Sequence, residues 1–269
     1  MRKIGINMFA VRDRSAEDYV KTVAELGFNT MFTGVCSTVA EQASLAELMA
    51  KHGLEYETIH APFGHINDIW LDCEGGDKML GELITSVDHC KAAGAPILVV
   101  HLSSGLTPPT ITDLGQARFA TLMEHAEKNG IMIAYENQRK LANIAWAFER
   151  FADAPSLGFC WDCGHENCFT YGRQYMPLFG KKLICTHIHD NNGPTLTNGH
   201  NDLHMLPFDG SFDYDRFARQ LNEVGYTGSL MLEVMKGQSQ GFYDAMSEDV
   251  YMQRAADAVK KLRTMVDGE

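Results

Sequence analysis

The sequence has 269 residues, of which 45% are hydrophobic and 22% are charged, and its formal net charge is −12. This composition is that of a globular protein, and the length fits one large domain. The negative charge argues against nucleic acid and anionic membrane surfaces as partners, because both expose phosphate.

The N-terminal segment and the cysteines indicate a cytoplasmic chain. Residues 1–13 contain too short an apolar run for a secretory signal peptide, and no run of about 18 apolar residues is present to span a membrane. The seven cysteines, an odd number, are expected to be free thiols of a reducing compartment. Cys160 and Cys163 form a C-x-x-C pair, but no second pair completes a zinc site, so we interpret them as structural thiols.

Short apolar or β-branched segments alternate with helical segments along the whole chain. Strands are predicted at residues 3–9, 29–35, 56–61, 96–102, 131–137, 157–162, 183–190 and 229–234. Helices are predicted at 15–27, 39–53, 76–94, 112–130, 141–152, 213–224 and 247–265, while 166–181 is less regular. Eight strands alternating with helices are typical of a (β/α)8 TIM barrel, here a single domain over residues 1–269. The alternative, an open doubly wound sheet, usually carries a glycine-rich first turn, which this sequence lacks.

Acidic residues and histidines end six consecutive predicted strands. They are His60, His101, Glu136, Asp162, His187 with Asp190, and Glu233, while His165, Asp202 and His204 lie in the loops that follow the sixth and seventh strands. One such residue alone is more often structural than functional. In a barrel, however, the C-terminal ends of all strands open at one mouth, where these side chains would converge. Clustered buried carboxylates need a cation, so we expect a divalent metal ion, Zn, Mn, Co or Mg.

The remaining histidines carry less information. His52, His89 and His125 fall inside predicted helices and are expected at the surface. His189 and His200 lie in the same histidine-rich stretch as His187 and His204.

Seven segments of the sequence resemble the xylose isomerase-like barrel superfamily. They are "IHAPFG", "VVHLSSG", "IAYENQ", "FCWDCGH", "HIHDN", "DLHMLPFDGSFDY" and "MLEV", which together run from residue 59 to residue 234. This superfamily includes sugar and sugar-phosphate isomerases and epimerases, inosose dehydratases, and DNA-repair enzymes of the endonuclease IV class. The resemblance therefore implies a metal-dependent enzyme on a TIM barrel, but it is much less specific for the substrate.

The resemblance also implies which residues hold metal. A metal site of the epimerase type would consist of Glu136, Asp162, His187 and Glu233. The endonuclease-type enzymes use three zinc ions, and their further ligand positions match His60, His101, His165, Asp202 and His204. His189 and His200 match no ligand position, so contact with substrate or solvent is expected for them.

Three activities are compatible with this ligand set. An isomerase or epimerase of a small sugar or sugar phosphate would use Glu136 and Glu233 both as metal ligands and as acid and base, through an enediolate. A dehydratase of the inosose or dehydroshikimate type would use the same site. A multi-metal phosphoesterase of the endonuclease IV type would need all nine positions. We expect the first, acting on a small polyhydroxylated substrate without nucleic-acid or membrane partners, in a chain that is compatible with a homo-oligomer.

Overall fold

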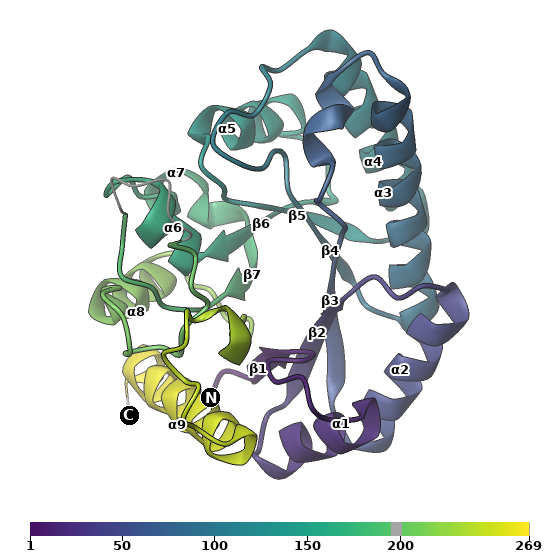
Figure 1. Cartoon of the computed structure of the whole chain (residues 1–269). Helices are drawn as coiled ribbons and strands as arrows, with labels where there is room; N and C mark the ends of the chain where they lie inside the picture. Colours follow the sequence, from purple (N-terminus) through teal and green to yellow (C-terminus); the bar gives the residue numbers. More distant parts are fainter. Residues whose placement is uncertain (195–200, 269) are drawn as a thin grey trace. The chain divides into compact units, whose positions relative to one another are not determined.

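The computed structural model describes residues 1–194 and 201–268 and contains eight parallel β-strands that alternate with helices (Figure 1). This confirms the (β/α)8 TIM-barrel class predicted from the sequence. Two compact units make up the chain: unit 1 comprises residues 1–31, 48–55 and 161–269, and unit 2 comprises residues 32–47 and 56–160. Among the described residues, no helix combines the length and the apolar character that crossing a membrane requires.

Unit 1 is built on strands β1 (Ile4–Asn7), β7 (Leu183–His187) and β8 (Leu230–Leu232). β1 pairs with β8 in parallel, from Ile4 opposite Leu230 to Ile6 opposite Leu232, and Ile188 just beyond β7 forms a parallel bridge with Leu232. The helices of this unit are α1 (Ala16–Glu25), α6 (Cys163–Phe169), α7 (Met176–Phe179), α8 (Tyr214–Glu223) and α9 (Glu248–Asp267), with short 3-10 turns at Gly180–Lys182 and Lys236–Gln238.

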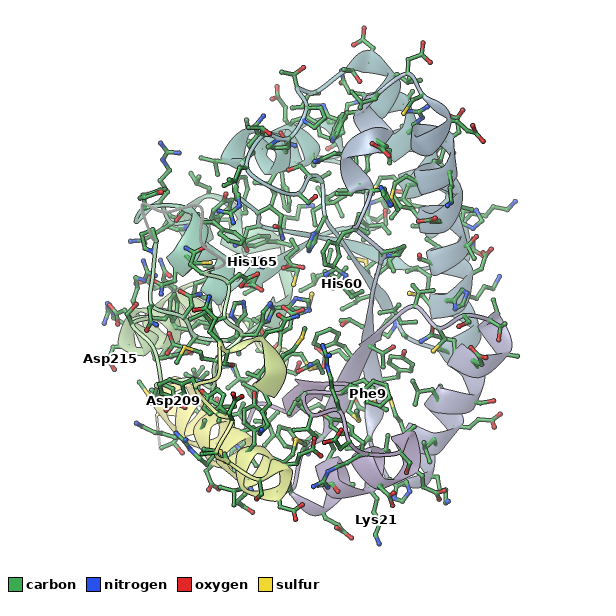
Figure 2. All side chains as sticks on the ribbon, viewed as in Figure 1. Phe9, Lys21, His60, His165, Asp209 and Asp215 are labelled. Carbon is green, nitrogen blue, oxygen red and sulfur yellow. The ribbon has the colours of Figure 1, made fainter. Side chains whose placement is uncertain are left out.

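Side-chain caps begin several helices of unit 1. The Ser15 hydroxyl accepts a hydrogen bond from the amide of Asp18, so that Ser15 is the N-cap of α1, as its position before the apolar pattern predicts. Ser247 caps α9 in the same way. In Figure 2 the side chain of Lys21 projects outward from α1, whereas that of His165 lies among other side chains of the unit. The capped helices thus present polar residues to solvent and leave the strand ends to the interior.

Unit 2 holds most of β3 (Glu55–His60), together with β4 (Ile97–Val100) and β5 (Met132–Glu136). β4 lies between its parallel neighbours β3 and β5, and β5 pairs onward with the first residues of β6. The helices are α3 (Glu74–Ala93), α4 (Asp113–Asn129) and α5 (Leu141–Arg150), with a 3-10 turn at Ile66–Trp70. α3 and α4 pack side by side (Figure 1). Each ends at a glycine in the left-handed conformation, as the glycine-terminated helical patterns predict.

Besides β3, whose first residue belongs to unit 1, three elements run from one unit into the other: β2 (Thr30–Gly34), α2 (Val39–Lys51) and β6 (Leu157–Asp162). β6 has the predicted bounds. β7 and β8 are shorter than predicted, because regular pairing stops at His187 and Leu232. The segment predicted to be less regular contains only short helices, α6 and α7, and a 3-10 turn.

One histidine contradicts its predicted position. His89 was expected at the surface of a helix, but it is only 3% exposed, and its Nδ1 lies 3.0 Å from the side-chain oxygen of Gln42. A polar partner within unit 2 therefore offsets the cost of burying this imidazole.

Candidate metal centre

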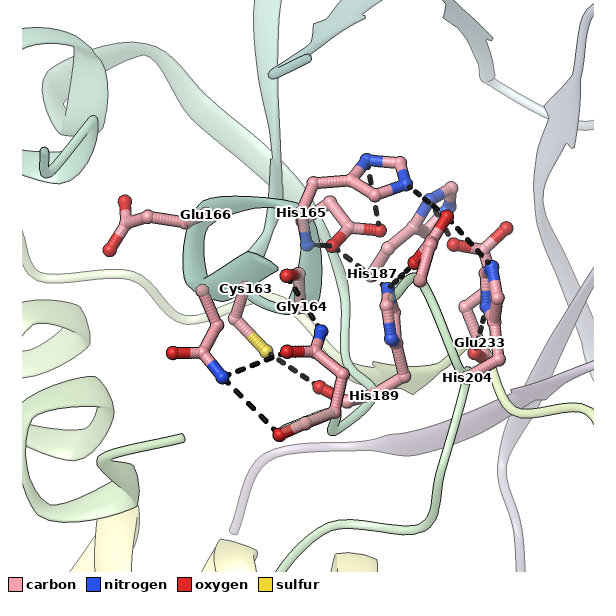
Figure 3. A network of polar contacts seen from close by, with 12 residues as sticks. Cys163, Gly164, His165, Glu166, His187, His189, His204 and Glu233 are labelled. Atoms are coloured by element: carbon pink, nitrogen blue, oxygen red, sulfur yellow. Dashed lines mark hydrogen bonds and ion pairs between the residues drawn. The ribbon is translucent and has the colours of Figure 1, made fainter. Parts of the chain in front are cut away.

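Three predicted ligands stand at the C-terminal ends of strands of unit 1. Asp162 ends β6, His187 ends β7, and Glu233 directly follows β8. All three are buried, and one ligand atom from each lies within 4.8 Å of the other two. His187 Nδ1 is 3.2 Å from Glu233 Oε2 (Figure 3). We call Asp162, His187 and Glu233 the strand-end cluster.

Backbone hydrogen bonds fix the strand ends that carry this cluster. The amide of Glu233 donates to the carbonyl of Ile188 at 3.0 Å, which joins the ends of β7 and β8. The amide of Val234 donates to the side chain of Asn7 at the end of β1, at 2.9 Å. Asp162 is the N-cap of α6, where its Oδ1 accepts a hydrogen bond from the amide of His165 at 2.6 Å. Hydrogen bonds donated by backbone amides therefore fix the strand ends that carry the cluster.

A second group lies in the same unit and consists of His165, His189, Asp202 and His204. One ligand atom from each lies within 4.8 Å of all the others. The Asp202 carboxylate is 3.2 Å from His165 Nε2, 3.5 Å from His204 Nε2 and 3.6 Å from His189 Nε2. The imidazole rings of His189 and His204 stack, with centroids 4.2 Å apart. We call these four residues the histidine cluster.

Main-chain contacts bring the loop residues Asp202 and His204 to this place. Asp190 and Met205 form an antiparallel bridge in which each amide donates to the other's carbonyl at 2.9 Å. The Asp190 carboxylate also accepts from the amides of Phe208 and Phe212, both at 3.1 Å. The predicted strand-end acid Asp190 thus anchors the loop through backbone amides.

His204 itself adopts an uncommon backbone conformation. Its φ of 44° lies in the left-handed region that non-glycine residues seldom occupy. Its carbonyl accepts from the amide of Met235 at 3.0 Å, and its Nδ1 donates to the carbonyl of Glu233 at 2.9 Å. These two contacts hold the imidazole with Nε2 facing Asp202.

Charge coupling within the histidine cluster shifts two pKa values in opposite directions. Burial works to lower the pKa of His204, but the adjacent Asp202 carboxylate outweighs it and raises this pKa to about 9. Burial works to raise the pKa of Asp202, but His204 and His165 outweigh it and hold the pKa well below its usual value. Without a metal ion, a proton on an imidazole therefore compensates the carboxylate.

Unit 2 contains a third group, formed by His60 at the end of β3, His101 just after β4, and Glu136 at the end of β5. Glu136 Oε2 is 3.1 Å from the Nε2 atoms of both His60 and His101, and the two Nε2 atoms are 3.2 Å apart. His60 Nδ1 donates to the carbonyl of Ala61 at 2.7 Å, which turns Nε2 toward Glu136. We call these residues the unit 2 group.

The donor atoms of all three groups suit a divalent cation. Imidazole nitrogens and carboxylate oxygens bind Zn²⁺ and other first-row divalent ions. In the strand-end cluster two buried carboxylates share one imidazole, and such buried negative charge is unfavourable unless a cation compensates it. The residues present therefore fit a metal ion.

Each predicted site residue falls into one of these groups. The strand-end cluster holds three of the four expected epimerase-type ligands, and the fourth, Glu136, belongs to the unit 2 group. Sequence reasoning missed His189, which is fully buried and belongs to the histidine cluster. The available signal was the H-x-H spacing of His187 and His189 at the end of a strand. His200 lies outside the described residues. Cys160 and Cys163 are buried and take part in no disulfide, and their role as structural thiols stays a prediction.

The chain belongs to the family of xylose isomerase-like TIM barrels, whose family model matches residues 20–263. This confirms the resemblance inferred from the sequence segments. A curated relative, the protein y4fM of Sinorhizobium fredii, is 29% identical over 196 residues, which are 67% of this chain and 58% of that protein. The chain thus spans less than two thirds of the length of that relative.

Two solved structures illustrate the fold. A D-tagatose 3-epimerase-like protein is 20% identical and superposes with a TM-score of 0.76, covering 99% of this chain and 98% of that one. The D-psicose 3-epimerase of Clostridium cellulolyticum H10, solved with D-tagatose, is 13% identical and has a TM-score of 0.79, covering 98% and 99%. At these identities the similarity shows the TIM-barrel fold.

Proposed function

We propose that the protein is a metal-dependent isomerase or epimerase that acts on a small sugar or sugar phosphate through an enediolate. The strand-end cluster carries this proposal, because it places two buried carboxylates and one imidazole within 4.8 Å of one another. The names of the solved structures support the substrate class, since they include D-tagatose-type and D-psicose epimerases. The net charge of −12 favours a small substrate over nucleic acid.

We infer that Asp162, His187 and Glu233 hold the metal ion, with Glu136 as the fourth ligand. The assignment of Glu136 rests on the sequence, because Glu136 ends the fifth strand of a fold whose strand ends carry the chemistry. A divalent ion held by these residues would polarise a substrate carbonyl and stabilise the negative charge of the enediolate.

The side chains of the site divide the remaining work. Glu233 is 8% exposed, so its carboxylate retains access from outside while Asp162 and His187 have none. A carboxylate with such access can remove the proton of a substrate C–H next to the carbonyl, and Glu136 would return a proton to the same carbon or its neighbour. Burial of Asp162 and His187 keeps water from the metal side of the site.

A specific observation favours a second candidate, a multi-metal phosphoesterase. The unit 2 group and the histidine cluster also gather metal-ligand side chains, so each could hold an ion of its own. Further ions could bind a phosphate, generate hydroxide and stabilise the leaving oxygen. A dehydratase would share the proton abstraction at the strand-end cluster and differ in expelling a β-hydroxyl group.

Solvent-deuterium exchange tests the proposal. The metal-loaded protein is incubated in D₂O with a panel of aldoses, ketoses and their phosphates, and the recovered sugars are examined by mass spectrometry and NMR. We expect deuterium at the carbon next to the carbonyl and a new isomer or epimer in at least one sample. Glu136→Gln should abolish both signals. Phosphate release from a panel of phosphate esters, with no deuterium in any sugar, would contradict the proposal in favour of the phosphoesterase.

A further inference from the structure

We propose that unit 2 contains a further ligand site, a cavity beside α3 that binds a small apolar alcohol or phenol, with Nε2 of His89 as the acceptor for its hydroxyl group. The cavity is separate from the three groups of metal-ligand side chains, because none of their residues lines it. The proposal therefore does not depend on the proposed sugar chemistry.

The cavity has a volume of about 480 Å³ and is lined by residues of unit 2. One wall consists of the segment 35–37, which follows β2, and of Pro62, which lies beyond β3. The other wall is a face of α3 and is formed by Lys78, Gly81, Glu82, Thr85, Ser86 and His89. The surface of both walls is mostly apolar. Small-molecule sites commonly have volumes of about 300–1,000 Å³ and combine apolar walls with a few polar groups, so this cavity suits a small organic molecule.

Hydrogen bonds at the side of the cavity fix which ring nitrogen of His89 carries a proton. The amide of Cys36 donates to Gln42 Oε1 at 2.7 Å, so this atom of the Gln42 side chain is the oxygen. Gln42 Nε2 in turn donates to the hydroxyl groups of Thr33, at 3.1 Å, and Tyr56. His89 Nδ1 lies 3.0 Å from the same Oε1 and donates to it, because an amide oxygen can only accept. The proton of the neutral ring is therefore on Nδ1, and Nε2 holds the lone pair.

The Nε2 atom of His89 is an acceptor that a ligand can use. Within residues 1–194 and 201–268, only Nδ1 of this ring has a hydrogen-bond partner. The ring is 3% exposed and lines the cavity. Burial lowers the pKa of His89, which keeps the ring neutral near pH 7. A donor that enters the cavity would thus pair with an acceptor that has little access to water.

The other polar groups of the lining favour an uncharged ligand. The Thr85 and Ser86 hydroxyls donate to carbonyls of the preceding turn of α3, at 2.9 and 2.7 Å, so they offer no spare proton to an anion. Lys78 and Glu82 lie 3.9 Å apart, and each partly offsets the other's charge. Carboxylates and phosphates can only accept at neutral pH, as Nε2 does, and a charged ammonium group loses more hydration than a hydroxyl group on entering apolar walls. A hydroxyl group on an apolar body matches the cavity best.

Titration of the zinc-loaded protein with phenol and with toluene tests this assignment. The two molecules are similar in shape, but only phenol can donate a hydrogen bond. Protein with ¹⁵N-labelled histidine is followed by NMR, which reports the state of each imidazole nitrogen. We expect phenol to shift the Nε2 resonance of His89 in the direction of a hydrogen-bonded nitrogen, and toluene to bind without this shift.

Two variants separate the hydrogen bond from the cavity. His89→Phe should weaken phenol binding by roughly 10-fold, the effect of one hydrogen bond, and leave toluene binding unchanged. Gly81→Leu should abolish the binding of both molecules, because its side chain fills the cavity. This variant should fold, since Gly81 is exposed in α3 and nothing lies within 4 Å of a Cβ there.

Thr121→Leu is the matched control, because it places the same side chain at an exposed position of α4, outside the cavity, and should change neither affinity. Phenol affinity of the wild-type level in Gly81→Leu would overturn the proposal. So would a His89 Nε2 resonance that does not move at saturating phenol, or wild-type protein that binds no phenol.

Discussion

The strand-end cluster and the histidine cluster lie in the same unit, but they differ in the balance of acid and imidazole. The strand-end cluster has two carboxylates for one imidazole, whereas the histidine cluster has three imidazoles for one carboxylate. A carboxylate that the metal ion does not fully neutralise can accept a proton from the substrate, and Glu233 is partly exposed to solvent. Neutral imidazoles can fill the coordination positions of a cation without adding negative charge to the site. We propose from this contrast that the strand-end cluster performs the chemistry and that the histidine cluster holds the loop.

The largest expected effect is loss of turnover on changing the strand-end cluster. Glu233→Gln keeps the shape of the side chain but removes the acceptor of the proton. We expect the rate of deuterium exchange to fall by about 10²–10⁴-fold, the range for a general acid or base. Glu223→Gln, at the exposed end of α8, is the matched control. Full activity in Glu233→Gln would remove this residue from the mechanism.

The double variant Asp202→Ala/His204→Ala tests how far turnover depends on the histidine cluster. It removes two of the four histidine-cluster ligands and leaves every strand-end ligand in place. We expect the turnover rate to fall by only roughly 10-fold. Loss of residues that position the site lowers the rate less than loss of the catalytic acid or base. Elemental analysis should still find one tightly held metal ion per chain. Complete loss of bound metal would show that the two clusters are not separate sites.

Gly164→Ala tests whether α6 is shaped around the His189 ring. The added methyl group would overlap the ring, and overpacking of this kind costs about 1–3 kcal/mol of unfolding free energy. Urea denaturation measures the loss, and Co²⁺ affinity of the histidine cluster should fall with it. Gly81→Ala is the control, because nothing lies within 4 Å of a Cβ there and α3 is a helix. That control should be neutral or slightly stabilising.

The smallest effect concerns pH and the metal-free protein. The folded-state pKa of His204 is raised to about 9, so its contribution to stability is complete below the unfolded value of about 6.5 and is lost as pH rises through 9. The lowered pKa of Asp202 acts oppositely, since its contribution is lost only at acidic pH below about 3.9. We expect metal-free protein to lose on the order of 2 kcal/mol between pH 7 and about 9.5. Thermal unfolding of Asp202→Asn should lack this loss.

The part of the site that local sequence patterns determine was predictable. Strand ends with polar residues identified Asp162, His187 and Glu233, because strand burial and barrel topology place such ends at the mouth. His189 was not predictable in this way. Its environment depends on the return of residues 201–204 through the bridge between Asp190 and Met205, a contact that no local pattern records. His89 was misplaced for the same reason, since its partner Gln42 lies on a different helix.

Anomalous diffraction from crystals of the zinc-loaded protein, measured at the zinc absorption edge, tests the separation of the two clusters most directly. We predict one peak between Asp162, His187 and Glu233 and a second, separate peak bounded by His165, His189, Asp202 and His204. The absence of a peak in the strand-end cluster, or a second peak that His189 does not contact, would contradict the account.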